Sequence, residues 1–208
     1  MENLVHFDIA AVIMLLVMLL TNMFSKRAKN TAGHIYVLLV GVTMVAALFN
    51  VFTVALENIG TDNVVLHNIV RTIYLLFHNT ATPLFVMYII SLTRTWHKFK
   101  TNPHIGIILL IPYFVVVGII VSNPFTNIVF TLENGALVKT TFADSLYFFA
   151  TFYVLLGFIY IIMYRRTLRI GAILVLCSSI PLGVIAVFVK HFFPRSLVEI
   201  FSNAVVLM

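Results

Sequence analysis

The feature that most constrains the fold of this chain is a series of long apolar stretches, separated from one another by short polar loops. A helix of about 20 apolar residues can cross the hydrocarbon core of a bilayer. The stretches are continuously apolar instead of alternating with a period of two, which favours helices over a β-barrel. Only 10% of the 208 residues are charged and 62% are hydrophobic, whereas soluble domains carry about 25% charged residues. We therefore predict an all-α, polytopic membrane helix bundle.

Seven apolar segments predict seven transmembrane helices. They cover about 7–24, 34–56, 68–92, 104–122, 144–163, 170–189 and 195–208. The last segment, which Pro194 begins, is shorter than the roughly 17 residues that a crossing helix needs. We expect it to be the truncated seventh helix of a longer protein.

The longest polar segment, 123–143, predicts a β-hairpin. Its centre is Asn134-Gly135, a dipeptide that favours the tight turns of hairpins. β-branched and apolar residues stand on both sides of this turn, as expected for two short strands.

Charge is divided between the two sets of loops. The first, third and fifth loops contain nine basic residues and no acidic one: Lys26, Arg27, Lys29, Arg94, Lys98, Lys100, Arg165, Arg166 and Arg169. The seven acidic residues lie on the other side or in the half of the bundle next to it: Glu2, Asp8, Glu57, Asp62, Glu133, Asp144 and Glu199. The positive-inside rule then places the N-terminus outside and the C-terminus in the cytoplasm, which agrees with an odd number of spans. The net charge of +6 thus marks topology and anionic headgroups, and no nucleic-acid partner is expected.

Polar residues inside the predicted spans follow helical spacing. In the third span Arg71, Tyr74 and His78 are separated by three and four residues, so they share one face. Similar spacing relates the polar residues of the second, fifth and seventh spans. The candidate ligand-binding residues are Asp8, Asn50, Thr53, Glu57, Arg71, Tyr74, His78, Asn79, Thr82, Tyr147, Thr151, Glu199 and Asn203. They lie in the outer half, and few comparable residues occupy the inner half, which predicts an outward-facing pocket instead of a continuous conduit.

A purely structural interpretation of these polar residues stays open. Asn50, His78 and Asn79 are of the types that form hydrogen bonds between membrane helices. Glu57, Arg71 and Glu199 are equally suited to a structural ion pair or triad. The side chains of Lys190 and Arg195 can reach headgroups by snorkelling. Pro83 is expected to kink the third span, either to shape the floor of the pocket or for packing alone.

The chain lacks the residues that several classes of enzyme and transporter require. The single cysteine, Cys177, excludes an internal disulfide and a site with several thiolates. The histidines are scattered over both sides without a His-Glu-x-x-His motif, and no glycine-rich phosphate loop occurs. The internal duplication typical of many transporters is also missing. We predict no catalytic residue, no cofactor and no metal site.

Short motifs in a particular order suggest a family. They are Phe7-Asp8, the run from Leu76 to Phe85 with Tyr88, the run from Asn123 to Phe130, Glu133-Asn134-Gly135, and Glu199-Ile200-Phe201. In these motifs the chain resembles the N-terminal seven-helix sensor region of bacterial diguanylate cyclases with GGDEF output domains, and the related region of some histidine kinases. The resemblance implies a receptor in the bacterial cell membrane, a homodimer through the full-length protein, and a cytoplasmic enzyme that this chain does not include. Asp8, His78, Asn79 and Glu199 are the candidates that also match these motifs.

Three hypotheses of function follow. The preferred one is a signal-input domain that binds a small molecule from the outer side and regulates a cytoplasmic output domain. The alternative is a small-molecule transporter or channel, which would need polar residues in the inner half too. The third is a scaffold that only anchors and pairs the missing enzyme. His78 and the carboxylates leave open that pH itself is the signal.

Overall fold

The computed structural model describes residues 5–24, 30–59, 63–93, 95–133, 136–140, 142–168, 170, 172–174, 176–177 and 204. Most of them are helical. The elements are α1 (Val5–Phe24), α2 (Thr31–Ile59), α3 (Val64–Leu92), α4 (Trp96–Thr101), α5 (Pro103–Thr126), β1 (Phe130–Glu133), β2 (Ala136–Lys139), α6 (Ala143–Met163) and a 3₁₀ turn (Arg165–Thr167).

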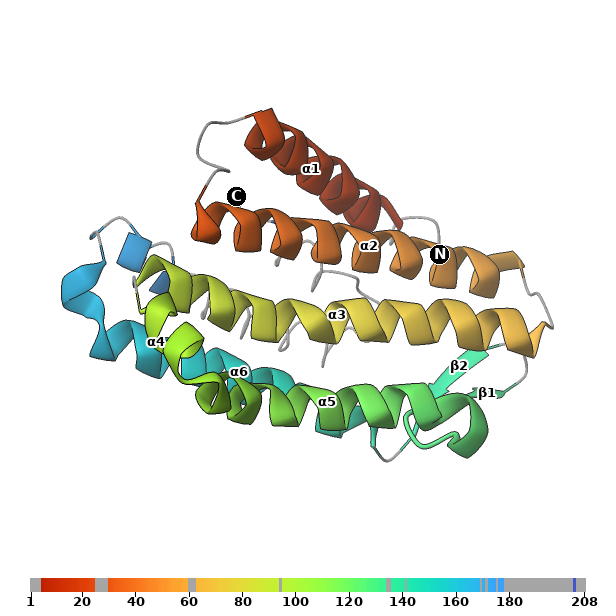
Figure 1. The fold of residues 1–208 in the computed structure, drawn as a ribbon. Helices are drawn as coiled ribbons and strands as arrows, with labels where there is room; N and C mark the ends of the chain where they lie inside the picture. Colours follow the sequence, from red (N-terminus) through yellow and green to blue (C-terminus); the bar gives the residue numbers. More distant parts are fainter. Residues whose placement is uncertain are drawn as a thin grey trace.

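The helix α3 lies in the middle of the bundle. It packs against α2, α5 and α6, while α1 packs against α2 (Figure 1). The directions of α2, α3, α5 and α6 alternate, so their connections gather at two ends. We call the end with β1 and β2 the hairpin end. The other, with α4 and the 3₁₀ turn, is the basic end.

The four helices α2, α3, α5 and α6 are long and apolar enough to cross a membrane, and the apolar part of α1, Ile9–Phe24, is shorter. Large apolar side chains such as Phe114 on α5 and Ile159 on α6 are exposed. Such side chains are stable against lipid, whereas extended apolar surface is rare on soluble proteins. The predicted all-α bundle of membrane-spanning character is confirmed at this level.

The predicted helices correspond closely to those observed in the first five segments, which form α1, α2, α3, α5 and α6. The predicted sixth and seventh spans fall mostly outside the described residues: helical positions are described only at 170, 172–174, 176–177 and 204. The count of seven spans therefore stays a prediction.

Two features near the loops differ from the expectation. The helix α5 continues through Pro124 to Thr126, beyond the predicted end at 122, and stops at Asn127, whose φ of 51° is left-handed. Asparagine accepts this conformation more readily than most residues, which makes it a suitable helix terminator. The short helix α4 was not predicted; its Trp96 and Phe99 pack against the core cluster of Val86, Ile90 and Tyr153.

The hairpin expected between 123 and 143 is present. β1 and β2 pair antiparallel, with Phe130 opposite Lys139 and Glu133 opposite Ala136. The predicted turn residues Asn134 and Gly135 lie outside the described residues.

Hydroxyl groups compensate for the two prolines in the middle of long helices. Pro83 has no N–H to donate to the carbonyl of Asn79, and the Thr82 hydroxyl donates to that carbonyl instead, at 3.1 Å. Beside Pro112, the Tyr153 hydroxyl of α6 accepts from the N–H of Tyr113 at 3.1 Å and donates to the carbonyl of Leu109 at 2.8 Å. Such compensation allows proline within membrane helices.

Helices α3 and α6 approach closely at Gly157. A Cβ atom at this position would lie 2.9 Å from the Cδ1 atom of Ile89. Small residues at helix contacts permit this approach in membrane bundles. The contact holds together the two helices that carry most of the polar residues discussed below.

Candidate functional site

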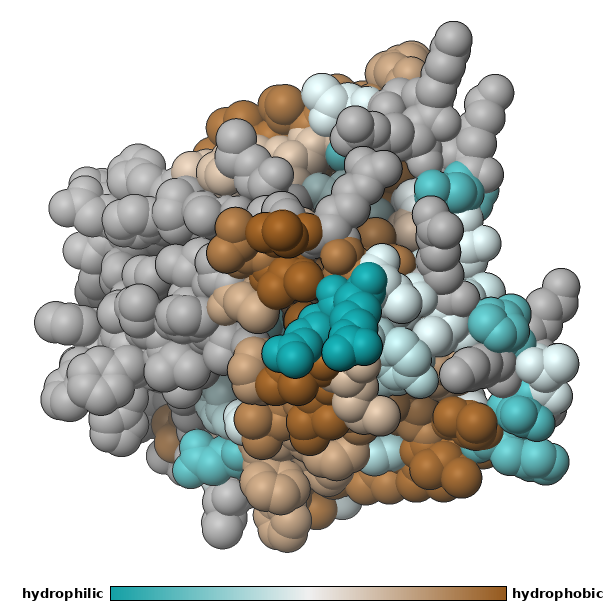
Figure 2. Space-filling model, turned by 90° about the vertical axis from the view of Figure 1, so that its left-hand side faces the viewer, coloured by the Kyte–Doolittle hydropathy of each residue, from teal (hydrophilic) through white to brown (hydrophobic). Residues whose placement is uncertain are grey.

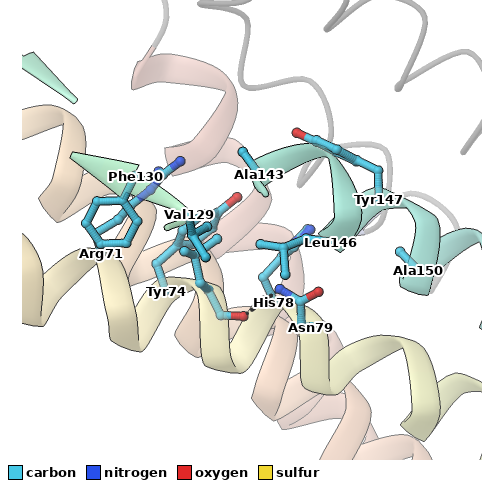
Figure 3. A pocket seen from close by; sticks show the side chains of 11 residues that line it. Arg71, Tyr74, His78, Asn79, Val129, Phe130, Ala143, Leu146, Tyr147 and Ala150 are labelled. Atoms are coloured by element: carbon cyan, nitrogen blue, oxygen red, sulfur yellow. Dashed lines mark hydrogen bonds between the residues drawn. The ribbon is translucent and has the colours of Figure 1, made fainter. Parts of the chain in front are cut away.

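A cavity of about 60 Å³ lies near the hairpin end, between α3, α6 and the residues that enter β1 (Figure 3). It is lined by Arg71, Tyr74, Leu75, His78, Asn79, Val129, Phe130, Ala143, Leu146, Tyr147 and Ala150. We call this cavity the Arg71 pocket. Its α3 residues face the α6 residues, with Val129 and Phe130 between them.

Arg71 supplies the positive charge of the pocket. Its Cζ atom lies 4.8 Å from the centroid of the Tyr74 ring, a cation–π contact. Its Nε atom is buried without a hydrogen-bond acceptor. Arginine stays protonated, and a charge without a counter-charge is unfavourable in the membrane interior.

Two aromatic residues continue the face of α3 below Arg71. The rings of Tyr74 and His78 stack with centroids 5.4 Å apart and planes inclined by 27°. Tyr74 is only 4% exposed. The spacing of three and four residues thus produces a column of cation, phenol and imidazole along one side of the cavity.

Asn79 closes the α3 side of the pocket. It is buried, and its Nδ2 atom donates to the carbonyl of Leu75 one turn earlier, at 2.8 Å. Part of its hydrogen-bonding capacity is therefore used within the helix. Tyr147 is the one candidate from α6 that reaches the pocket.

Asn123 fixes the segment that forms one wall of the pocket. It is fully buried, and its Oδ1 atom accepts from the N–H groups of Val129 at 2.7 Å and of Phe130 at 3.2 Å. Its Nδ2 atom donates to the carbonyl of Phe130 at 3.2 Å. Asn123 was not among the predicted site residues, although an amide directly before a hairpin can signal this role.

The remaining candidates lie elsewhere. Asn50 and Thr53 are buried on α2 away from the pocket lining, and the Thr53 hydroxyl donates to the carbonyl of Phe49 at 2.9 Å. Glu57 and Thr151 are exposed. The hydroxyls of Thr82 and Thr151 donate to the backbone carbonyls of Asn79 and Tyr147. Asp8 belongs to α1 but its side chain is not described, and Glu199 and Asn203 lie outside the described residues.

A second polar region lies at the basic end. The hydroxyls of Thr93 and Thr95 are 2.9 Å apart, and Thr95 also bonds to the hydroxyl of Tyr160. Thr93 donates to the carbonyl of Ile90 at 2.8 Å. We call these three residues the hydroxyl cluster. The cluster was not predicted, because Thr93 and Thr95 lie at the end of a helix and Tyr160 lies in an apolar run.

The surface of the basic end carries charge. Arg165 and Arg166 are exposed there. Figure 2 looks onto this end and shows strongly hydrophilic residues bordered by hydrophobic ones. This combination is typical of the boundary between a membrane and water.

Metal chemistry finds no support in the part of the chain that the structure describes, where no group of three or more His, Cys, Asp or Glu residues could hold a metal ion. Comparisons with protein families, with curated proteins and with solved structures found no match. Fold and site define the class of protein: an all-α bundle of membrane-spanning character with a polar pocket near one end.

Proposed function

We propose that this chain is the signal-input domain of a membrane receptor, which binds a small molecule in the Arg71 pocket. The observation that carries the proposal is the composition of that pocket: a cation, a stacked phenol and imidazole, an amide and a second phenol around one cavity. Ligand sites typically combine an apolar lining with a few convergent polar groups.

The charge of the loops supports the orientation. By the positive-inside rule the basic end faces the cytoplasm, and the Arg71 pocket then opens toward the outside. With seven spans, the N-terminus is outside and the C-terminus reaches the cytoplasm. The resemblance of the sequence motifs to bacterial sensor regions favours the bacterial cell membrane, a homodimer, and a diguanylate cyclase or histidine kinase as the regulated domain.

The packing of α3 suggests how a signal would travel. A single helix carries both Arg71 near the hairpin end and Leu92 near the basic end. The same helix contacts α6 at Gly157 and Ile89. A ligand that binds one arrangement of α3 and α6 more tightly than another would shift the population toward it. Because α3 extends from one end of the bundle to the other, the new arrangement would change its cytoplasmic end while the ligand stays in the pocket.

Thermal unfolding of the purified chain against a panel of small molecules tests the proposal. The panel holds carboxylates, amines, amino acids, sugars and aromatic alcohols. We expect at least one class to raise the unfolding midpoint, with a smaller rise for Tyr74→Leu and His78→Ala. Thr151→Val, an exposed change on α6, is the matched control. A panel without any stabilising compound, or equal shifts in all variants, would contradict the proposal.

Proteoliposomes distinguish the receptor from the transporter. The compound that stabilises the chain should not pass through the membrane of vesicles that contain the protein. The polar groups of the hydroxyl cluster at the basic end are bonded to one another or to backbone carbonyls, so they offer a substrate no polar path. Flux that depends on the protein would favour the transporter hypothesis instead. The same vesicles also report the orientation of Arg165 through protease access.

A further inference from the structure

We propose that the Arg71 pocket recognises a carboxylate group, which the Arg71 guanidinium binds. This inference rests on the proposed function and names the class of its ligand. It begins from Arg71, the one Lys, Arg, Asp or Glu among the described residues that line the pocket, and from its Nε–H, which has no acceptor.

The charge of Arg71 is not neutralised by the carboxylates that the structure places. The two acidic side chains that it describes, Glu57 and Asp144, are exposed, and neither lines the pocket. An arginine in a partly buried, mostly apolar setting is stabilised by an anion. As far as the described residues go, the pocket therefore offers an anion a positive charge without a competing carboxylate.

The geometry of the donors favours a planar anion. The Nε–H of Arg71 is buried without an acceptor. In arginine this group and a neighbouring Nη–H form a fork that matches the two oxygens of a carboxylate. A point-like anion would use only part of that fork.

Tyr74 restricts the position of the Arg71 guanidinium before a ligand binds. The ring centroid lies 4.8 Å from Cζ, and the ring in turn stacks on His78. This cation–π contact holds the guanidinium at the side of the cavity that both residues line. Less conformational freedom is then lost when the ligand binds.

The size of the pocket agrees with a small head group. Its volume is about 60 Å³, whereas a cavity that binds benzene measures about 150 Å³. A carboxylate with one or two carbon atoms fits such a space. Any larger body of the ligand would have to extend out of the cavity.

Acetate is the probe for this inference. Thermal unfolding of the 208-residue chain in detergent is followed while sodium acetate replaces sodium chloride at constant ionic strength. We expect a saturable rise of the midpoint with acetate and none with acetamide, which has the same shape without the charge. Arg71→Gln should abolish the rise, and Arg71→Lys, which keeps the charge but loses the fork, should weaken the apparent affinity about tenfold. Arg166→Gln at the basic end is the control and should respond as the unmodified chain does.

Saturation-transfer NMR of acetate gives a second readout on the unmodified chain, in case Arg71→Gln does not fold. Transfer that Tyr74→Leu diminishes supports the inference. No acetate response, an equal response to acetamide, or a full response in Arg71→Gln would overturn it. Acetate binding by Glu199→Gln but not by the unmodified chain would also overturn the inference. It would mean that a carboxylate of the chain itself occupies the pocket in the unmodified protein.

The panel described above separates the two proposals. A stabilising compound without a carboxylate, whose effect depends on Tyr74 and His78, would reject the carboxylate and keep the receptor. A panel in which no compound depends on the pocket would reject both.

Discussion

Two polar regions lie near the two ends of α3, and they differ in how their hydrogen-bonding groups are used. In the hydroxyl cluster, Thr93, Thr95 and Tyr160 bond to one another or to backbone carbonyls. In the Arg71 pocket, a charged donor is buried without an acceptor beside an empty volume. Buried polar groups are nearly always satisfied in native proteins. Internal hydrogen bonds thus explain the first region by architecture alone, whereas the second is the region for which we propose a ligand.

The largest expected effect concerns Asn123, which holds the pocket wall formed by Val129 and Phe130. Asn123→Ala leaves two N–H groups and one carbonyl of residues 129 and 130 without their buried partner. We expect a loss of about 3 kcal/mol in the free energy of unfolding and faster hydrogen exchange across 129–140. Asn127→Gly is the control, because Asn127 is exposed and its φ of 51° suits glycine. Unchanged exchange in Asn123→Ala would contradict the role of this amide.

The next effect concerns the helix contact that joins the two regions. Gly157→Leu places a large side chain against Ile89, which is fully buried. Overpacking of this kind should lower the free energy of unfolding by about 2 kcal/mol, measured by denaturant titration in detergent. Gly118→Leu is the matched control on α5, where a Cβ would meet nothing within 4 Å. Equal stability of the two variants would show that α3 and α6 are not held closely at this point.

A substitution of Arg71 should stabilise the chain, whereas the two substitutions above should destabilise it. Without ligand, Arg71→Met removes an uncompensated charge and should raise the free energy of unfolding by about 1 kcal/mol, after the loss of the contact with Tyr74. Thermal unfolding in chloride buffer measures this difference. A marked destabilisation would mean that Arg71 is a structural residue with a partner.

The smallest effect concerns the hydroxyl cluster. Tyr160→Phe removes the hydroxyl that bonds to Thr95 and should destabilise the chain by about 0.6 kcal/mol, the typical value of a hydrogen bond between membrane helices. The response to acetate should not change. Loss of that response would indicate that the two regions act as one site.

The helices were predictable because lipid leaves few alternatives to a continuous apolar helix. Hydropathy alone located α2, α3, α5 and α6. Boundaries set by local capping, such as the end of α5 at Asn127, depend on backbone conformation that hydropathy does not report. The helix α4 is held by the tertiary contacts of Trp96 and Phe99, which no local pattern predicts.

The pocket was predictable mainly along α3, with Tyr147 as the one candidate from α6 that lines it. The spacing of Arg71, Tyr74 and His78 placed them on one face, and they do line one cavity. Sequence spacing does not reveal how neighbouring helices are rotated, so Asn50 and Thr53 turned out to be buried elsewhere. The apolar wall of Val129 and Phe130 carried no polar signal at all.

Hydrogen–deuterium exchange of the unmodified chain with and without acetate compares the two regions in one experiment. We expect slower exchange in the hairpin, residues 129–140, and in the first turns of α6 near Tyr147, with no change across 95–101 at the basic end. Protection confined to 95–101, or equal protection at both ends, would contradict the assignment of the Arg71 pocket as the ligand site.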